Sequence, residues 1–581
     1  MEINKSIELK SVKGDIKNVF IKERCFNNNI IAEGDLTLYE ITKKILKNRG
    51  VNTSKDIKNF LYPSLSSLYS PFLLQDMDIA VDRLIKAIKS REKIFIVGDY
   101  DVDGVTATSI MLKFFQDIGV HANFYIPKRE DGYGLSLAAI KSAHSNGATL
   151  LITVDNGITN IDEIRFAKEI GIDVIITDHH EPQDELPNAY AIINPKRSGS
   201  KFPFKDLSGV GVAFNLLVAL RNRLRKNNFF KSDNEPNLKK YLDLVALGTL
   251  ADIVPLLDEN RVCVKFGLSN SDASCVGLEY LKRVSKINGN LTSRNVGFSI
   301  APRINAAGRL YDASIAVDMF VKDDEDEVEN IARKLDEINN ERRKLQSLVV
   351  SEIEKNVAGT QQSVIVASGK GWHRGVVGIA ASSISSKYLR PAIIISKMDG
   401  ISVGSGRSVG DIDLFSAVKE TGDILERFGG HKMAVGISIK NELIETFSER
   451  INDIVSEKYG DYEINKTYNV DCEVSLNVFN RHFLTELSKL EPYGHSNEEP
   501  LFFVKHTVVK DKNMILNKYP KYMLSDGTQN IWAISFDTKM DLQIGNVYNI
   551  IFTAGMNNGY MSYTIKDAFL VDMNNMNLGD I

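Results

Sequence analysis

The sequence predicts an α/β protein of several domains: a parallel-sheet domain is joined by a long helix to a second α/β domain, and a small β-barrel follows. Three observations predict this fold class. Between residues 93 and 195, short β-branched runs alternate with helical patterns, which is typical of a parallel sheet covered by helices. Residues 323–357 form an uninterrupted helical pattern. From about residue 465, strand-like runs alternate with turns.

The length of the chain supports this division. With 581 residues it is too long for a single hydrophobic core, and three or so domains are expected. Residues 1–48 are predicted to form an N-terminal arm with a helix near 38–48. The remaining predicted parts are the first α/β domain, the connecting helix, the second α/β domain and the barrel, at 49–322, 323–357, 358–463 and 464–581.

Elements of the first α/β domain follow from hydrophobic periodicity. The predicted strands are five short apolar runs at 94–97, 123–126, 150–154, 174–177 and 189–193. Helical patterns lie between or after them, at 105–118, 136–146, 161–170, 211–226 and 238–250. Runs this short and this apolar indicate strands that are buried on both faces of a parallel sheet.

Three of these strands end in acids or histidines. The first is followed by Asp99, Asp101 and Asp103, another by Asp155, and a third by His179 and His180. Ligands of open parallel sheets bind at the carboxyl ends of the strands, so these side chains are expected in one crevice. Carboxylates so close together repel one another unless cations neutralise them. A ligand set of Asp and His without Cys favours Mn²⁺ or Mg²⁺.

The stretch at 323–357 is rich in Glu, Lys and Arg, lacks Gly and Pro, and places apolar residues at helical spacing. As one helix of about 35 residues it would reach about 50 Å, a length that suits a strut between two domains. The alternative is a pair of ordinary helices with an unmarked break.

The C-terminal region contains five strand-like runs, at 502–509, 521–524, 531–536, 548–552 and 561–565. Five short strands in a little over a hundred residues favour an OB-fold barrel. Aromatic residues interleaved with lysines suit the stacking of single-stranded bases, although half or more of these aromatics are expected in the barrel core. Tyr519 and Tyr522, in a lysine-rich turn region, are the predicted surface residues.

Composition restricts the function classes further. The net charge of −4 neither indicates nor excludes nucleic acid, because binding needs only a local basic groove. The four cysteines are scattered without CxxC spacing, which argues against a zinc-thiolate site and favours a reducing cytoplasm. Neither a signal peptide nor an apolar run of membrane-spanning length is apparent. A cytoplasmic protein that does not bind membranes is therefore expected.

A series of motifs in fixed order resembles the DHH phosphoesterase family, and within it the bacterial single-strand-specific 5′ exonucleases. The motifs are VGDYDVDG (97–104), EDGYGLS (130–136), TVDNGI (153–158), ITDHH (176–180), ALGTLADIVPL (246–256), APRINAAGRL (301–310), GWHRGVVGIAAS (371–382), GSGRS (404–408) and GGHKMAVG (429–436). The resemblance covers nearly the whole chain. It implies a DHH catalytic domain at 49–322, a DHH-associated domain at 358–463, and 5′ to 3′ hydrolysis of single-stranded DNA to nucleotides in recombination and repair.

The resemblance also implies roles for individual residues. Two divalent cations, Mn²⁺ or Mg²⁺, are expected on Asp99, Asp101, Asp103, Asp155, His179, His180 and Asp252, and all of these except Asp99 are the expected catalytic residues. His180 could instead act as an acid or orient the nucleophile. A second group without acids is predicted to bind substrate phosphates, since Arg matches phosphate oxygens bidentately: Arg303, Asn305, Arg309, His373, Arg407 and His431.

Two other functions remain open at this point. One is a phosphodiesterase acting on short RNA or cyclic dinucleotides, which the additional barrel argues against. The other is an inactive DNA-binding scaffold, which the complete set of acids and histidines argues against. By resemblance, the expected partners are single-stranded DNA, a single-strand-binding protein and a RecQ-type helicase, and the protein is expected to be a monomer.

Overall fold

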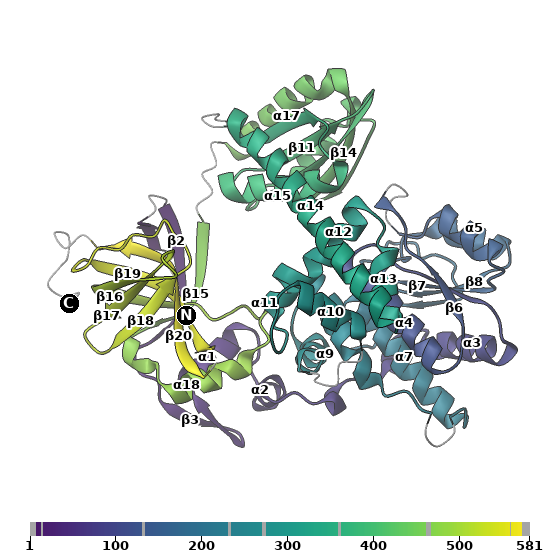
Figure 1. Ribbon diagram of the computed structural model, residues 1–581, viewed down its shortest axis with the longest axis horizontal. Helices are drawn as coiled ribbons and strands as arrows, with labels where there is room; N and C mark the ends of the chain where they lie inside the picture. Colours follow the sequence, from purple (N-terminus) through teal and green to yellow (C-terminus); the bar gives the residue numbers. More distant parts are fainter. Residues whose placement is uncertain are drawn as a thin grey trace.

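The computed structural model describes residues 7–12, 16–129, 134–230, 234–269, 275–357, 362–460, 466–557 and 559–571. Residues 130–133 of the EDGYGLS motif, and the outer ends of the predicted arm and barrel, lie outside these ranges. Three bodies are apparent: a blue and teal α/β body, a green α/β body above it, and a yellow barrel beside it (Figure 1). The predicted fold class is confirmed.

The first body is built on a parallel sheet in the order β6-β5-β7-β8-β9. Its strands are β5 (Ile94–Val97), β6 (Ala122–Tyr125), β7 (Leu150–Val154), β8 (Asp173–Thr177) and β9 (Ala191–Ile193). All residues of β5 and β7 are buried, which explains why these strands are continuous apolar runs in the sequence. The predicted intervening helices are α4 (Val102–Asp117), α5 (Leu137–Ser145) and α6 (Ile161–Glu169).

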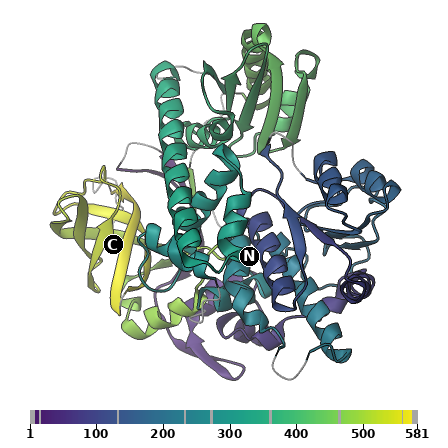
Figure 2. The ribbon, with the colours of Figure 1, turned by 45° about the vertical axis from the view of Figure 1, so that its right-hand side comes forward.

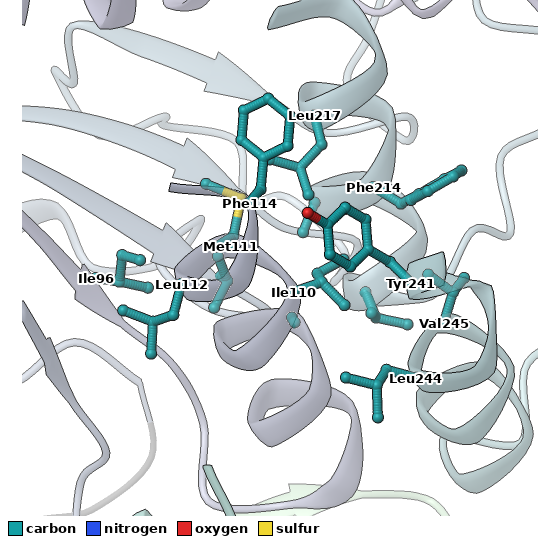
Figure 3. Close-up of a cluster of buried hydrophobic side chains, with 14 of the residues drawn as sticks. Ile96, Ile110, Met111, Leu112, Phe114, Phe214, Leu217, Tyr241, Leu244 and Val245 are labelled. Atoms are coloured by element: carbon teal, nitrogen blue, oxygen red, sulfur yellow. The ribbon is translucent and has the colours of Figure 1, made fainter. Parts of the chain in front are cut away.

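A helical layer packs on one face of this sheet. The central helix, α4, is buried from Val102 to Phe115. Figure 3 shows Phe114 and Met111 of α4 gathered with Leu217 of α7 (Gly209–Lys226) and with Tyr241, the residue directly before α8 (Leu242–Ala251). The helices of this body are α3 (Met77–Ser90), α7 (Gly209–Lys226), α8 (Leu242–Ala251), α9 (Asp258–Leu268), α10 (Val276–Val284), α11 (Ser293–Asn295), α12 (Ala301–Leu310) and α13 (Ser314–Val321).

The predicted strut is one continuous helix of 33 residues, α14 (Glu325–Val357), so the alternative of two helices is wrong. Val328 and Leu335, in its first half, belong to the core of the first body. Val349 and Ile353, in its second half, pack in the core of the second body. Figure 2 shows the helix running from one body to the other.

The second body is a five-stranded sheet in the order β10-β11-β12-β14-β13. Strands β10 and β11 pair in parallel. The pairs β11–β12, β12–β14 and β13–β14 are antiparallel. The strands are β10 (Ile365–Lys370), β11 (Ala392–Lys397), β12 (Ile401–Arg407), β13 (Arg427–His431) and β14 (Ala434–Lys440), and the helices are α15 (Arg374–Tyr388), α16 (Leu414–Lys419) and α17 (Ile444–Tyr459).

The third body is a closed barrel. Its five strands pair in the cycle β16-β17-β18-β20-β19 and back to β16. They are β16 (Phe502–Ile515), β17 (Tyr519–Ser525), β18 (Asn530–Ser535), β19 (Val547–Asn557) and β20 (Tyr560–Leu570), and α18 (Arg481–Leu487) precedes them. Each strand coincides with one predicted run, except that Phe536 lies one residue beyond β18, and the barrel prediction is confirmed.

The N-terminal arm is part of the barrel body. Strand β2 (Ile16–Cys25) pairs in parallel with β15 (Lys466–Val474), and β1 (Ile7–Lys10) extends the sheet beyond it. A hairpin of β3 (Ile30–Glu33) and β4 (Leu36–Tyr39) leads into α1 (Glu40–Asn48) and α2 (Ser54–Leu61), whose apolar residues join the barrel core. Figure 1 shows the purple arm against the yellow strands.

Among the described residues, no helix has both the length and the apolar composition needed to cross a membrane.

Candidate metal centre

The predicted metal ligands come from five elements, β5, α4, β7, β8 and α8, and lie at one end of the parallel sheet. Asp99 follows β5, and Asp101 is the N-cap of α4, where its Oδ1 accepts the Gly104 N–H at 3.0 Å. Asp155 follows β7. His179 and His180 follow β8, and Asp252 caps the C-terminal end of α8. The strands are parallel neighbours, so their carboxyl ends meet at one edge.

All seven predicted ligands fall into three overlapping groups whose ligand atoms lie within 4.8 Å of one another. The groups are Asp155, His179 and His180; Asp103, His179 and Asp252; and Asp99, Asp101 and Asp155. His179 Nε2 lies 3.1 Å from Asp155 Oδ1 and 3.5 Å from Asp252 Oδ2. The structure therefore brings the whole predicted set into one crevice.

The crevice is electrostatically unfavourable without a positive charge. Burial, together with the neighbouring Asp101, raises the pKa of Asp99 to about 7. Burial and nearby carboxylates also raise the pKa of Asp103 and Asp155 well above the usual value. The carboxylates therefore need a cation in order to stay ionised together near neutral pH.

Several donor atoms are free to bind that cation. Within the described residues, the buried atoms Asp99 Oδ1, His179 Nε2 and Asp252 Oδ2 form no hydrogen bond. Buried polar atoms are normally paired, so such a cluster calls for a ligand. Oxygen and imidazole nitrogen without sulfur are donors that Mn²⁺ and Mg²⁺ accept. The residues fit divalent cations.

The local backbone is shaped around the acids. Asp155 has a φ of 62°, a left-handed conformation that non-glycine residues rarely adopt and that is common at functional sites. The first turn of α7 approaches closely, since a Cβ at Gly209 would lie 2.4 Å from Asp155 Oδ1. Amides of the same turn bind Asp103: Gly209 and Val210 donate to its carboxylate at 2.6 and 2.9 Å. These contacts hold two of the acids in place.

Asp178 is a residue that the sequence reasoning did not assign to the site. Its buried carboxylate accepts hydrogen bonds from the backbone of Ile158 and His179 and from His180 Nδ1, the last at 2.7 Å. Burial opposes ionisation, but the hydrogen bond and charge of His180, together with the Ile158 amide and the charge of His179, outweigh it, and the pKa of Asp178 is lowered. A carboxylate on Nδ1 orients the ring of His180 so that Nε2 can bind a metal, which is the usual arrangement around metal-bound histidine. The signal was present in the sequence as the first residue of DHH.

We expect Asp178→Ala to lower activity by roughly 10- to 100-fold, the usual loss when the partner of a metal-binding histidine is removed. The reason is that His180 loses the group that orients its ring. The measurement is exonuclease rate against Mn²⁺ concentration. Asp178→Asn keeps an acceptor for Nδ1 and should retain more activity, and unchanged metal dependence in Asp178→Ala would contradict this role.

A cluster of arginines lies beside the crevice. Burial, followed by the charges of Arg129, Arg342 and Arg407, lowers the pKa of Arg309 to about 10. Arg129 lies over the ring of Tyr100 at 4.8 Å, next to Asp99. Within the described part of the chain, no carboxylate forms an ion pair with Arg309 or Arg407. Two arginines that lie close together without a carboxylate in an ion pair favour an anionic ligand such as phosphate. Arg129 and Arg342 were not identified from the sequence, because no motif marks them.

The other members of the predicted phosphate-binding group are dispersed. Arg303 is committed to Asp336 of α14, with contacts of 2.9 and 2.7 Å, and is only 8% exposed. Asn305 is half-buried on α12. His373 caps α15, where its Nδ1 accepts the Gly375 N–H at 3.0 Å, and His431 is exposed at the end of β13. Arg303 is thus held in an ion pair within the first body, between α12 and the first half of α14.

Of the two barrel tyrosines predicted at the surface, one is buried. Tyr522 is 0% exposed, donates its hydroxyl to Met540 O at 2.8 Å, and belongs to the core, so its prediction as a surface residue was wrong. Neighbouring residues of a strand face opposite sides, and Tyr522 faces inward from β17. Tyr519 is half-buried, lies edge-on to the exposed Phe536 at 5.4 Å, and has the Lys518 ammonium 5.0 Å from its ring.

Three family models match consecutive parts of the chain. The DHH family N-terminal domain matches residues 93–249, the DHHA1 domain 361–457, and the RecJ OB domain 470–565. The parallel sheet, the acid and histidine crevice and the second α/β body are thus those of the DHH class. The match of the barrel to the RecJ OB domain and the identity with RecJ proteins of other bacteria define the family within this class. The chain belongs to the RecJ family.

Relatives named single-stranded-DNA-specific exonuclease RecJ cover most of the chain. The protein from Bacillus subtilis is 38% identical, over 88% of this chain and 64% of its own length. The protein from Haemophilus influenzae is 33% identical, over 86% of this chain and 89% of its own length. The chain therefore spans less than two thirds of the first relative and nearly all of the second.

Solved structures agree with the fold. The crystal structure of RecJ from Thermus thermophilus in complex with Mn²⁺ aligns with a TM-score of 0.76 and 29% identity, over 91% of this chain and 75% of that one. A structure described as exonuclease RecJ bound to manganese aligns with a TM-score of 0.59 and 34% identity, over 68% of this chain and 96% of that one.

Proposed function

We propose that this chain is a two-metal exonuclease that hydrolyses single-stranded DNA from the 5′ end to nucleotides. The observation that carries the proposal is the crevice in which seven acids and histidines meet, with buried donor atoms left free. The names of the relatives and the manganese bound in related structures support the substrate and the metal. The direction of hydrolysis rests on the resemblance alone.

The residues of the crevice have different proposed roles in binding the cations and in orienting the ligands. Asp155 and His179 each belong to two of the three ligand groups, so they are the candidates to serve both cations. Two cations held by these residues would lower the pKa of a water and stabilise charge on the phosphoryl oxygens. Asp178 orients His180, and the amides of the α7 turn hold Asp103. The site is thus built before substrate arrives, as electrostatic catalysis requires.

The arginine cluster, defined as Arg129, Arg309, Arg342 and Arg407, would hold substrate phosphates beside the metals. Its members approach the crevice from several elements, including α12, α14 and β12. Backbone contact between bodies sets this geometry: a Cβ at Gly375 of α15 would lie 2.1 Å from the carbonyl oxygen of Arg309. The phosphate-binding surface therefore depends on the alignment of both α/β bodies.

The test is hydrolysis of end-labelled polynucleotides. A long single strand labelled at its 5′ or 3′ end is compared with a dinucleotide, with Mn²⁺ and with chelator. Rapid release of the 5′ label from the long strand, only with Mn²⁺, is the expected result. Preference for the dinucleotide would indicate the short-substrate phosphodiesterase, and binding without hydrolysis would indicate the inactive scaffold.

We expect Tyr519→Ala to weaken binding of a long single strand by roughly 5- to 150-fold, because stacking contributes about 1–3 kcal/mol per base. Hydrolysis of a short oligonucleotide should be unchanged, since no predicted metal ligand lies in the barrel. Affinity is measured by fluorescence anisotropy at fixed salt. Tyr190→Ala removes an exposed tyrosine of the first body and is the control. Equal affinity of the Tyr519 variant and the wild type would assign the barrel another role.

The proposal includes the remaining expectations from the resemblance. These are a monomer in the cytoplasm, acting in recombination and repair with a single-strand-binding protein and a RecQ-type helicase.

A further inference from the structure

Two cysteines that are far apart in sequence meet inside the barrel body. Cys25 is the last residue of β2 and Cys472 lies in β15, separated by 447 positions. Their sulfur atoms are 3.5 Å apart, in hydrogen-bond contact. Both side chains are buried, at 3% and 0% exposure. Neither contributes to the metal centre or to the arginine cluster, so the proposed nuclease activity leaves the pair unexplained.

The surroundings of Cys25 favour its thiolate. A hydrogen bond with Cys472, against the effect of burial and aided by the charge of Lys44, holds the pKa of Cys25 below its usual value. The Lys44 side chain is 28% exposed and pairs with Glu40 at 3.1 Å, so the cysteine lies one side chain below the surface. Thiolate character beside a cation is the property that distinguishes reactive from inert cysteines.

The other two cysteines provide an internal contrast. Burial raises the pKa of Cys263 and Cys275, the latter to about 12. Cys275 donates to the carbonyl oxygen of Phe320 at 3.4 Å. The only contact between two cysteine sulfurs among the described residues is that of Cys25 and Cys472. Cys263 and Cys275 should therefore stay reduced under conditions that oxidise a paired thiol.

We propose that Cys25 and Cys472 form a redox-responsive site, at which a peroxide converts the two thiols to a disulfide that ties the N-terminal strand to the barrel body. The Cys25 thiolate attacks a peroxide oxygen, which yields a sulfenic acid and, with one proton, the first water. The Cys472 sulfur then attacks the Cys25 sulfur, the S–S bond forms, and the hydroxyl leaves with the Cys472 proton as the second water. The two thiols supply the two electrons that reduce hydrogen peroxide.

Disulfide formation requires only a small movement of the two sulfur atoms, and Cys25 lies at the end of its strand, where the backbone is least constrained. A disulfide requires a sulfur separation of about 2 Å, so the sulfurs must approach by roughly 1.5 Å. Cys25 and its partner Val474 are the last paired residues of β2 and β15, and residues beyond Cys25 leave the strand. The bond would add a covalent link to strands that are joined only by hydrogen bonds.

The experiment treats the full-length protein with hydrogen peroxide, then denatures it and counts free thiols. The expected count falls from four to two, and dithiothreitol restores four. Tryptic digestion should yield peptide 25–43 linked to peptide 467–481, with Cys263 and Cys275 alkylated. The midpoint of thermal unfolding should rise on oxidation and return on reduction.

Matched variants separate this site from general oxidation. Cys25→Ser should retain three thiols after peroxide and show no shift in the unfolding midpoint, whereas Cys263→Ser should still form the linked peptide. Four intact thiols after treatment, a disulfide between two copies of the chain, or oxidation of Cys263 or Cys275 at the same rate would each overturn the proposal. Nuclease activity is not part of the readout, so the result is independent of the proposed function.

Discussion

Asp155→Ala is expected to lower the rate of single-strand hydrolysis by about 10³-fold or more. Asp155 belongs to two of the three ligand groups, and its loss removes a donor shared between the proposed cation sites. Metal-ion stabilisation of phosphoryl charge contributes several kcal/mol, and each 1.36 kcal/mol is about tenfold in rate. The measurement is single-turnover hydrolysis of an end-labelled strand at saturating Mn²⁺, with metal content determined in parallel.

The fold should survive this change, because burial and neighbouring acids raise the pKa of Asp155 well above its usual value and its removal relieves repulsion. Because the left-handed φ of residue 155 disfavours alanine and opposes this gain, we expect an unfolding midpoint close to that of the metal-free wild type. Asp184→Ala, at an exposed acid shortly after the DHH motif, is the control and should retain full activity. Turnover near the wild-type rate by the Asp155 variant in Mn²⁺ would refute the two-metal assignment.

Arg261→Ala is expected to destabilise the contact between the first body and the barrel body by about 3 kcal/mol or more, because several buried carbonyl oxygens lose their donor at roughly 1–3 kcal/mol each. Arg261 of α9 is 1% exposed. Its guanidinium lies over the ring of Phe60 at 3.8 Å and donates to Phe60 O at 3.0 Å. It also donates, at 2.9 to 3.3 Å, to the carbonyl oxygens of four consecutive residues, Lys489, Leu490, Glu491 and Pro492.

The cost arises because these carbonyls would be left buried without donors. Among the described residues no carboxylate forms an ion pair with Arg261, and burial lowers the pKa of its guanidinium to about 9. Thermal unfolding and limited proteolysis between the bodies measure the effect, with Arg283→Ala, an exposed arginine of α10, as the control. Arg261→Lys should recover little, since an ammonium cannot reach so many acceptors. An unchanged unfolding midpoint in Arg261→Ala would show that other contacts hold the bodies together.

Much of this protein is determined by local sequence pattern. Buried strands such as 94–97 and 150–154 are apolar runs because both of their faces are covered, and the acids that follow them mark the edge where a parallel sheet binds ligands. The uninterrupted pattern at 323–357 predicted a single helix, because nothing in it can break one. The motifs at the ends of these strands likewise predicted which acids and histidines meet in one crevice.

Other features depend on which surfaces meet, and those contacts are not encoded locally. The pairing of β2 with β15, and with it the contact of Cys25 and Cys472, joins segments more than 440 positions apart. Tyr519 and Tyr522 stand in the same lysine-rich stretch, yet the register of β17 turns Tyr522 into the core. Arg303 stands in a phosphate-binding type of motif, but Asp336 neutralises it once α12 and α14 are packed. Local pattern determines an element and its buried face, whereas the partner of an exposed or charged side chain is decided only when distant elements come together.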